Sequence, residues 1–119
     1  MPAPNLFLVY VSDADASTAF YRDLFDLEPV FTSPRYVAFP VAPGVLFAIW
    51  TGAGTPDPQA RRYSEVALMV PPGDDVDEWF ERWSVTEARV VREPHDDVFG
   101  RTFVVADPDG NHIRVCPTD

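Results

Sequence analysis

Two halves of the chain repeat one order of strand-like and helix-like segments, and this repeat constrains the fold more than any other feature. A displacement of 59 positions places Leu6 on Glu65, Val11 on Val70 and Phe20 on Trp79. Few residues are identical, but the polar and apolar patterns of the two halves match. Such self-similarity is typical of a duplicated supersecondary unit. We therefore predict an α+β fold of tandem βαβββ units, whose curved sheets form an eight-stranded cup with the helices outside.

The first unit, residues 1–52, has the pattern of one strand, one helix and three further strands. Ser12 and Asp13 are good N-caps, and an apolar stripe after them predicts a helix that ends near Phe25. A segment rich in Gly, Pro, Asp and Arg, residues 53–62, predicts a linker. β-Branched and aromatic runs predict strands at 5–11, 28–32, 35–39 and 45–50.

The second unit, residues 63–119, repeats this order within a single domain that spans residues 1–119. A helix is predicted over 75–83, with Trp79, Phe80 and Trp83 on a stripe that packs in the core. The sequence Asp-Pro-Asp-Gly at 107–110 predicts a tight hairpin turn. Strands are predicted at 64–70, 85–91, 101–106 and 111–116, with a loop at 93–99.

Composition excludes several classes of partner. Nineteen acidic residues oppose nine arginines, and the net charge is −10 at pH 7, which argues against nucleic acid and anionic membranes. No apolar run approaches 18 residues, so no membrane span is expected, and residues 6–11 are too short for a signal peptide. Cys116 is the single cysteine, which excludes an intrachain disulfide and favours a cytoplasmic location.

The chain resembles the vicinal-oxygen-chelate superfamily, which includes glyoxalase I, bleomycin-resistance proteins and extradiol dioxygenases. The resemblance rests on the duplicated unit, on residues 11–13 with 19–21, and on the turn at 107–110 followed by Asn-His-Ile-Arg-Val. Residues 9–13, residues 99–104 and Trp50 are similar to a subgroup that includes phenazine-antibiotic resistance proteins. This resemblance implies a homodimer, domain-swapped or unswapped, that binds an aromatic drug without transforming it.

The resemblance also identifies the positions that hold metal ligands in relatives. These positions carry Leu6, Ala48, Glu65 and Arg114 here. Hydrocarbon side chains and a guanidinium have no lone pair for a divalent ion. We therefore expect no metal, no other cofactor and no catalytic residue.

Strand alternation and the resemblance together select candidate ligand-binding residues. Trp50 is expected to stack on a flat ring, or alternatively to pack in the core or in a dimer interface. Glu65 and Arg114 are expected to form an ion pair, a polar anchor for the ligand, or both. The full set of candidates is Trp50, Arg114, Glu65, Tyr10, Leu6, Leu8, Ala48, Met69, Phe39, Phe99 and His112.

The leading hypothesis is non-catalytic binding and sequestration of a small aromatic compound, for example a phenazine-like antibiotic. The alternative is a metal-dependent lyase or dioxygenase of the same superfamily, which would need ligands that the matched positions lack. A metal-free enzyme with Glu65 as general base is disfavoured because the neighbouring Arg114 would make it a weak base. A structural partner domain is also compatible with the sequence, although nothing in it favours that role.

Overall fold

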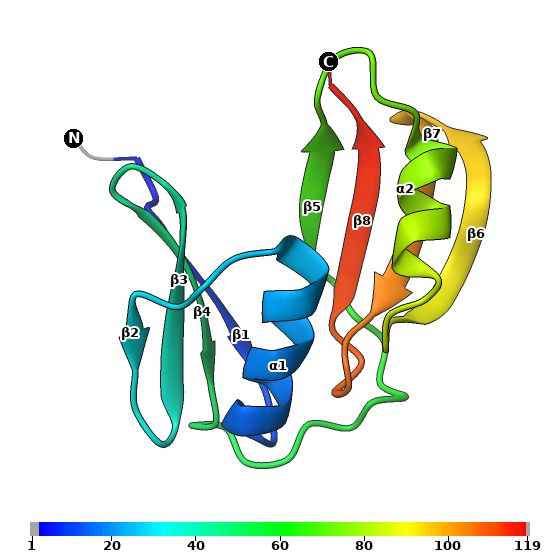
Figure 1. Ribbon diagram of the computed structural model, residues 1–119. Helices are drawn as coiled ribbons and strands as arrows, with labels where there is room; N and C mark the ends of the chain where they lie inside the picture. The colour runs from blue at the N-terminus through cyan, green and yellow to red at the C-terminus, as the bar shows by residue number, and fades with distance from the viewer. Residues whose placement is uncertain (1–2, 119) are drawn as a thin grey trace. The chain divides into compact units, whose positions relative to one another are not determined.

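The two repeated halves fold into two units, and each has its own four-stranded sheet and one main helix (Figure 1). The computed structural model describes residues 3–118. The chain divides into Met1–Asp57 and Pro58–Asp119, at a boundary inside the predicted linker. The α+β architecture of tandem βαβββ units is thereby confirmed. Neither helix within residues 3–118 has the length and apolar character that a membrane crossing requires.

The sheet of the first unit has the strand order β1-β4-β3-β2. Strand β1 runs parallel to β4, and the other neighbours are antiparallel. The elements of this unit are β1 (Leu6–Tyr10), α1 (Ala14–Phe25), β2 (Phe31–Thr32), β3 (Tyr36–Ala42) and β4 (Val45–Trp50).

Helix α1 begins and ends where its local chemistry allows. The Asp13 side chain accepts a hydrogen bond from the backbone N–H of Ala16 at 3.1 Å, which confirms the predicted N-cap. Asp26 ends the helix in a left-handed conformation with φ 54°. Tyr21 and Phe25 pack their rings on Phe47 of β4, at centroid distances of 4.9 and 5.7 Å. The helix therefore covers the face of the sheet to which Phe47 belongs.

The sheet of the second unit repeats this topology in the order β5-β8-β7-β6. Strand β5 runs parallel to β8, and the other neighbours are antiparallel. The elements of this unit are β5 (Glu65–Val70), α2 (Val76–Trp83), β6 (Arg89–Asp97), β7 (Gly100–Ala106) and β8 (His112–Pro117).

Helix α2 covers one face of the second sheet. Phe80 and Trp83 contact Phe103 of β7 edge to face, at centroid distances of 5.2 and 5.7 Å. Asp77 at the start of the helix accepts a hydrogen bond of 3.0 Å from Arg101 Nε, and this bond raises the pKa of Arg101. Of the predicted apolar stripe, Trp83 is buried, whereas Phe80 and Trp79 are only partly buried.

Two strands differ from their predicted bounds for reasons that involve proline. Strand β6 runs from Arg89 to Asp97, so the strand predicted after α2 is present, but its predicted bounds of 85–91 and most of the predicted loop at 93–99 were wrong. Because β6 is an edge strand with two bulges, it tolerates Pro94. Strand β3 likewise continues past Pro40, because β2 pairs only with Val37 and Ala38 and leaves β3 a single neighbour beyond them.

The predicted hairpin turn between β7 and β8 is built around the buried carboxylate of Asp107. Its Oδ1 accepts hydrogen bonds from the backbone N–H groups of Asp109 and Asn111, at 2.9 and 2.8 Å. Arg62 donates from Nη2 to the carbonyl oxygen of Asp109 at 2.5 Å. Gly110 has φ 85°, and a Cβ there would lie 2.5 Å from the carbonyl oxygen of Pro58. The turn therefore fixes the start of β8. It also contacts Pro58 and Arg62, which lie in the segment before β5.

Replacing Gly110 by alanine is expected to destabilise the second unit through both strain and overlap. Gly73→Ala is the matched control, because Gly73 has φ 89° but open space around its Cβ. The control is expected to lower the free energy of unfolding by about 1 kcal/mol, because alanine is strained in the left-handed conformation. Gly110→Ala is expected to cost about 1–3 kcal/mol more, the range for overpacking. Urea unfolding measures both, and equal losses would contradict the close packing at Gly110.

Candidate functional site

The face of the first sheet that α1 leaves uncovered carries most of the predicted ligand-binding residues of that unit. Leu8 pairs with Ala48, and Tyr10 pairs with Trp50, so these side chains share a face. Leu6 follows the same alternation. Phe47, which packs on α1, points to the opposite side. The structure therefore brings together Leu6, Leu8, Tyr10, Ala48 and Trp50 on one face, called here the open face.

Four aromatic side chains cross one end of the open face, one from each strand. We call them the aromatic row, and they are Tyr10, Trp50, Tyr36 and Phe31. The rings of Tyr10 and Trp50 are 5.7 Å apart and tilted by 37°, and those of Phe31 and Tyr36 are 5.9 Å apart. Tyr10 and Trp50 are 43% and 37% exposed, so their rings are accessible to a ligand.

Small side chains lie beside the aromatic row. Ala38 pairs with Ala48 in the middle of the sheet, between the row and the end of the strands where Pro40 pairs with Leu46. Both alanines are buried, at 1% and 0% exposed, so the middle of this face is not accessible, whereas Tyr10 and Trp50 at its end are exposed. The structure places Ala48 on the predicted face, but the accessible space expected beside it is not found.

Phe39 does not share this face. It pairs with Phe47, is fully buried, and its ring lies 6.3 Å from that of Phe47. Because neighbouring residues of a strand point to opposite sides, Phe39 faces α1 whereas Ala38 and Pro40 face outward. The structure therefore places this candidate in the core on the helix side of the sheet.

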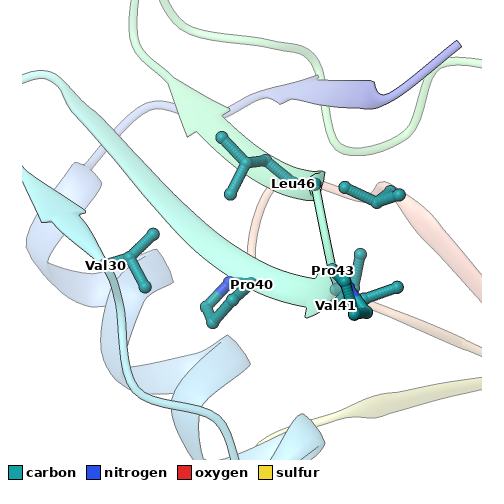
Figure 2. A pocket seen from close by; sticks show the side chains of 8 residues that line it. Val30, Pro40, Val41, Pro43 and Leu46 are labelled. Atoms are coloured by element: carbon teal, nitrogen blue, oxygen red, sulfur yellow. The ribbon is translucent and has the colours of Figure 1, made fainter.

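An open hollow of about 600 Å³ lies at the end of the sheet away from the aromatic row. Figure 2 shows Val30 beside Pro40, Leu46 on the neighbouring strand, and Val41 with Pro43 at the hairpin. No charged side chain lines it, so it offers apolar contacts and backbone groups only. It is lined by Val30, Pro40, Val41, Ala42, Pro43, Gly44, Val45 and Leu46, none of which was a sequence candidate.

The uncovered face of the second sheet carries a polar cluster around Arg114. Arg114 Nε donates to Glu65 Oε1 at 2.5 Å, and Nη1 donates to Thr102 Oγ1 at 3.2 Å. Its Cζ lies 4.6 Å from the centroid of the Phe99 ring. The side chains of Arg114 and Glu65 are only 16% and 31% exposed, so the pair is partly withdrawn from water. The guanidinium is held in one orientation by three neighbours.

The remaining candidates of the second unit lie on the same face at different distances from this arginine. His112 is two residues before Arg114 on β8 and pairs with Glu65 across the parallel ladder. Met69 alternates with Glu65 along β5 and is well exposed at the far end of that strand. Phe99 reaches Arg114 from the turn between β6 and β7. The structure thus groups Glu65, Phe99 and His112 around Arg114 and leaves Met69 apart.

The residues at the metal positions of the resemblance do not fit a divalent ion. Leu6 and Ala48 are hydrocarbon side chains and Arg114 is a cation, so Glu65 is the only one with a donor oxygen. That carboxylate already accepts a hydrogen bond from Arg114. Within residues 3–118, no group of three or more His, Cys, Asp or Glu side chains is placed to hold a metal ion.

Sequence reasoning missed Thr102, although the signal was present. Thr102 is buried, accepts from Arg114, and donates to the carbonyl oxygen of Val115 at 2.7 Å. The hairpin turn at 107–110 fixes the register that pairs Val104 with Arg114. A polar residue two positions from Val104 on the same face is therefore within reach of that arginine.

The comparison with family models places this architecture among known proteins. Residues 3–115 match the model described as the Glyoxalase/Bleomycin resistance protein/Dioxygenase superfamily. The chain therefore belongs to this superfamily. It is 53% identical to the phenazine antibiotic resistance protein EhpR of Enterobacter agglomerans, over 98% of this chain and 92% of the relative.

Solved structures agree on the fold. The solution structure of protein ATC0852 from Agrobacterium tumefaciens has a TM-score of 0.81 and 32% identity, over 100% of this chain and 99% of that chain. The fosfomycin resistance protein FosX of Listeria monocytogenes has a TM-score of 0.78 and 20% identity, over 100% and 95% of the two chains. The resemblance inferred from the repeat and its motifs is confirmed.

A double-mutant cycle on Glu65 and Arg114 is expected to show a favourable coupling. Because the pair is partly buried, Glu65→Gln with Arg114→Met should give a coupling of about 1–2 kcal/mol. The control is the pair Arg22–Glu28, whose side chains are 44% and 77% exposed and which should couple by no more than about 0.5 kcal/mol. Urea unfolding of the four variants of each cycle measures the two values. Equal couplings would show that the Arg114 pair is no better held than a surface pair.

Proposed function

We propose that this protein confers antibiotic resistance by binding and sequestering a small aromatic compound of the phenazine type, without converting it. The aromatic row carries this proposal. Exposed aromatic rings on an otherwise apolar sheet face form a surface on which a planar ring system stacks. Small-molecule sites are mostly apolar with few polar groups, and the open face has that character.

The relatives support the chemical class of the ligand. A protein that is 53% identical over nearly the whole chain is named as a phenazine antibiotic resistance protein. Phenazines are flat, three-ring aromatic molecules, which suits stacking on an indole. Trp50 is the broadest ring of the aromatic row and is therefore assigned the main stacking contact.

Arg114 is proposed as the polar anchor for the ligand. Glu65 and Thr102 engage Nε and Nη1, and no hydrogen-bond partner of Nη2 is found among the described residues. A guanidinium that is fixed in place and keeps donors available can bind a carboxylate or a carbonyl oxygen with directional hydrogen bonds. The proposed role is binding, because a guanidinium bound to a carboxylate is neither a base nor a nucleophile.

Catalytic alternatives find less support in these residues. A metal-dependent lyase or dioxygenase needs a set of donor atoms that Leu6, Ala48 and Arg114 do not supply. A general base must be directed at a proton of the substrate, and the Glu65 carboxylate is directed at Arg114 through Oε1. Sequestration requires neither feature.

Trp50→Ala is expected to weaken the binding of phenazine-1-carboxylate by about 1–3 kcal/mol, the magnitude of lost stacking and burial. Isothermal titration calorimetry measures the affinity. Trp79→Ala is the matched control, because it removes the same side chain from helix α2, on the other side of its sheet, and should leave affinity unchanged. Equal effects of the two substitutions, or none, would contradict stacking on Trp50.

Arg114→Gln is expected to reduce the affinity for a charged ligand more than the affinity for a neutral one. Binding of phenazine-1-carboxylate should weaken by about 1.5–3 kcal/mol, the value of a hydrogen bond to a charged group, while binding of unsubstituted phenazine changes little. Arg101→Gln is the control, since Arg101 bonds to Asp77 of α2 and should affect neither ligand. Equal weakening of both ligands by Arg114→Gln would indicate damage to the sheet instead of loss of an anchor.

A further inference from the structure

The indole of Trp50 folds back over the turn that follows β4, and it can do so only because residue 52 is glycine. A Cβ built on Gly52 would overlap Cε2 and Cζ2 of Trp50 and would lie 2.5 Å from Cη2. Carbon atoms in contact are normally about 3.5–4.0 Å apart. The benzene half of the indole therefore occupies the space that a side chain at position 52 would fill.

The need for glycine at this position is steric and not conformational. Five other glycines have a positive φ between 73° and 89°, but Gly52 does not. An alanine could therefore adopt the backbone of Gly52 without strain. Its methyl group would instead meet the far end of the Trp50 side chain, which can rotate away. The expected consequence of such a substitution is a displaced indole in a folded protein.

The chain around Gly52 is held firmly enough for this contact to matter. The carbonyl oxygen of Trp50 accepts a hydrogen bond from the N–H of Val11 at 3.0 Å. Arg35 Nε donates to Thr51 Oγ1 at 2.9 Å, and the N–H of Thr51 donates to the carbonyl oxygen of Arg35 at 3.0 Å. Because the backbone on both sides of the indole is fixed, a methyl group at position 52 is accommodated by moving the ring.

We infer that Gly52 is a positioning residue, which holds the Trp50 indole beside Tyr10 in the orientation that the aromatic row presents to a ligand. Tyr10 contacts the ring on one side, and the bare backbone of Gly52 supports it on another. The position of the ring follows from these contacts alone, whereas its consequence for binding rests on the function proposed above.

The first test follows the ring without any ligand. Protein labelled with 5-fluorotryptophan should give one ¹⁹F signal for each of Trp50, Trp79 and Trp83, with the Trp50 signal assigned by Trp50→Phe. Gly52→Ala should shift the Trp50 signal and leave the other two in place. Gly54→Ala is the control: with φ 78° it strains the same turn, but its Cβ would meet open space, so it should leave the Trp50 signal in place. An unmoved Trp50 signal in Gly52→Ala would overturn the inference.

The second test asks whether binding depends on Gly52 through Trp50. Gly52→Ala should lower the affinity for phenazine-1-carboxylate roughly tenfold, which is the effect of losing one aromatic contact. The same change made in a Trp50→Ala background should cause no further loss. A loss of equal size in both backgrounds would overturn positioning through the indole. A shifted Trp50 signal with unchanged affinity in both Gly52→Ala and Trp50→Ala would support the positioning of the ring and overturn the proposed stacking function.

Discussion

One helix covers only one face of each four-stranded sheet, and most features of this protein follow from that constraint. In the first unit, the aromatic side chains of α1 pack against Phe47, so the alternate residues of the same strands face outward. The sequence places aromatic and small apolar residues there. An apolar face without a covering helix must be solvated or covered by something else, and the proposed ligand-binding surface rests on this argument.

The second unit has the same architecture, but its uncovered face has different side chains. Its uncovered face carries an arginine whose guanidinium is fixed by Glu65, Thr102 and Phe99. Burying a charge is costly unless it is paired, and here the pairing also sets the direction of the remaining donors. The uncovered faces of the two units thus differ in chemistry: one carries aromatic side chains, and the other carries an arginine held by polar neighbours.

The repeated fold and part of the candidate site could be predicted from local sequence rules. The cap at Asp13 and the turn at 107–110 depend on a few neighbouring residues, and strand alternation placed Tyr10 and Trp50 on one face. The predictions failed where distant pairing decides the outcome. Strand β6 tolerates a proline because it is an edge strand, and Phe39 faces the helix because of its register with β4. The contact of Gly52 with an indole depends on a rotamer, which no sequence pattern specifies.

The proposed function is that the protein binds an aromatic compound and does not convert it. The most direct measurement is to incubate a molar excess of phenazine-1-carboxylate with the purified protein, with and without added Mn²⁺, and to analyse the recovered compound by liquid chromatography and mass spectrometry. Sequestration predicts that the compound is recovered with unchanged mass, and that the fraction withheld from solution scales with the amount of protein. Accumulation of a product in excess of the protein would contradict sequestration and identify an enzyme.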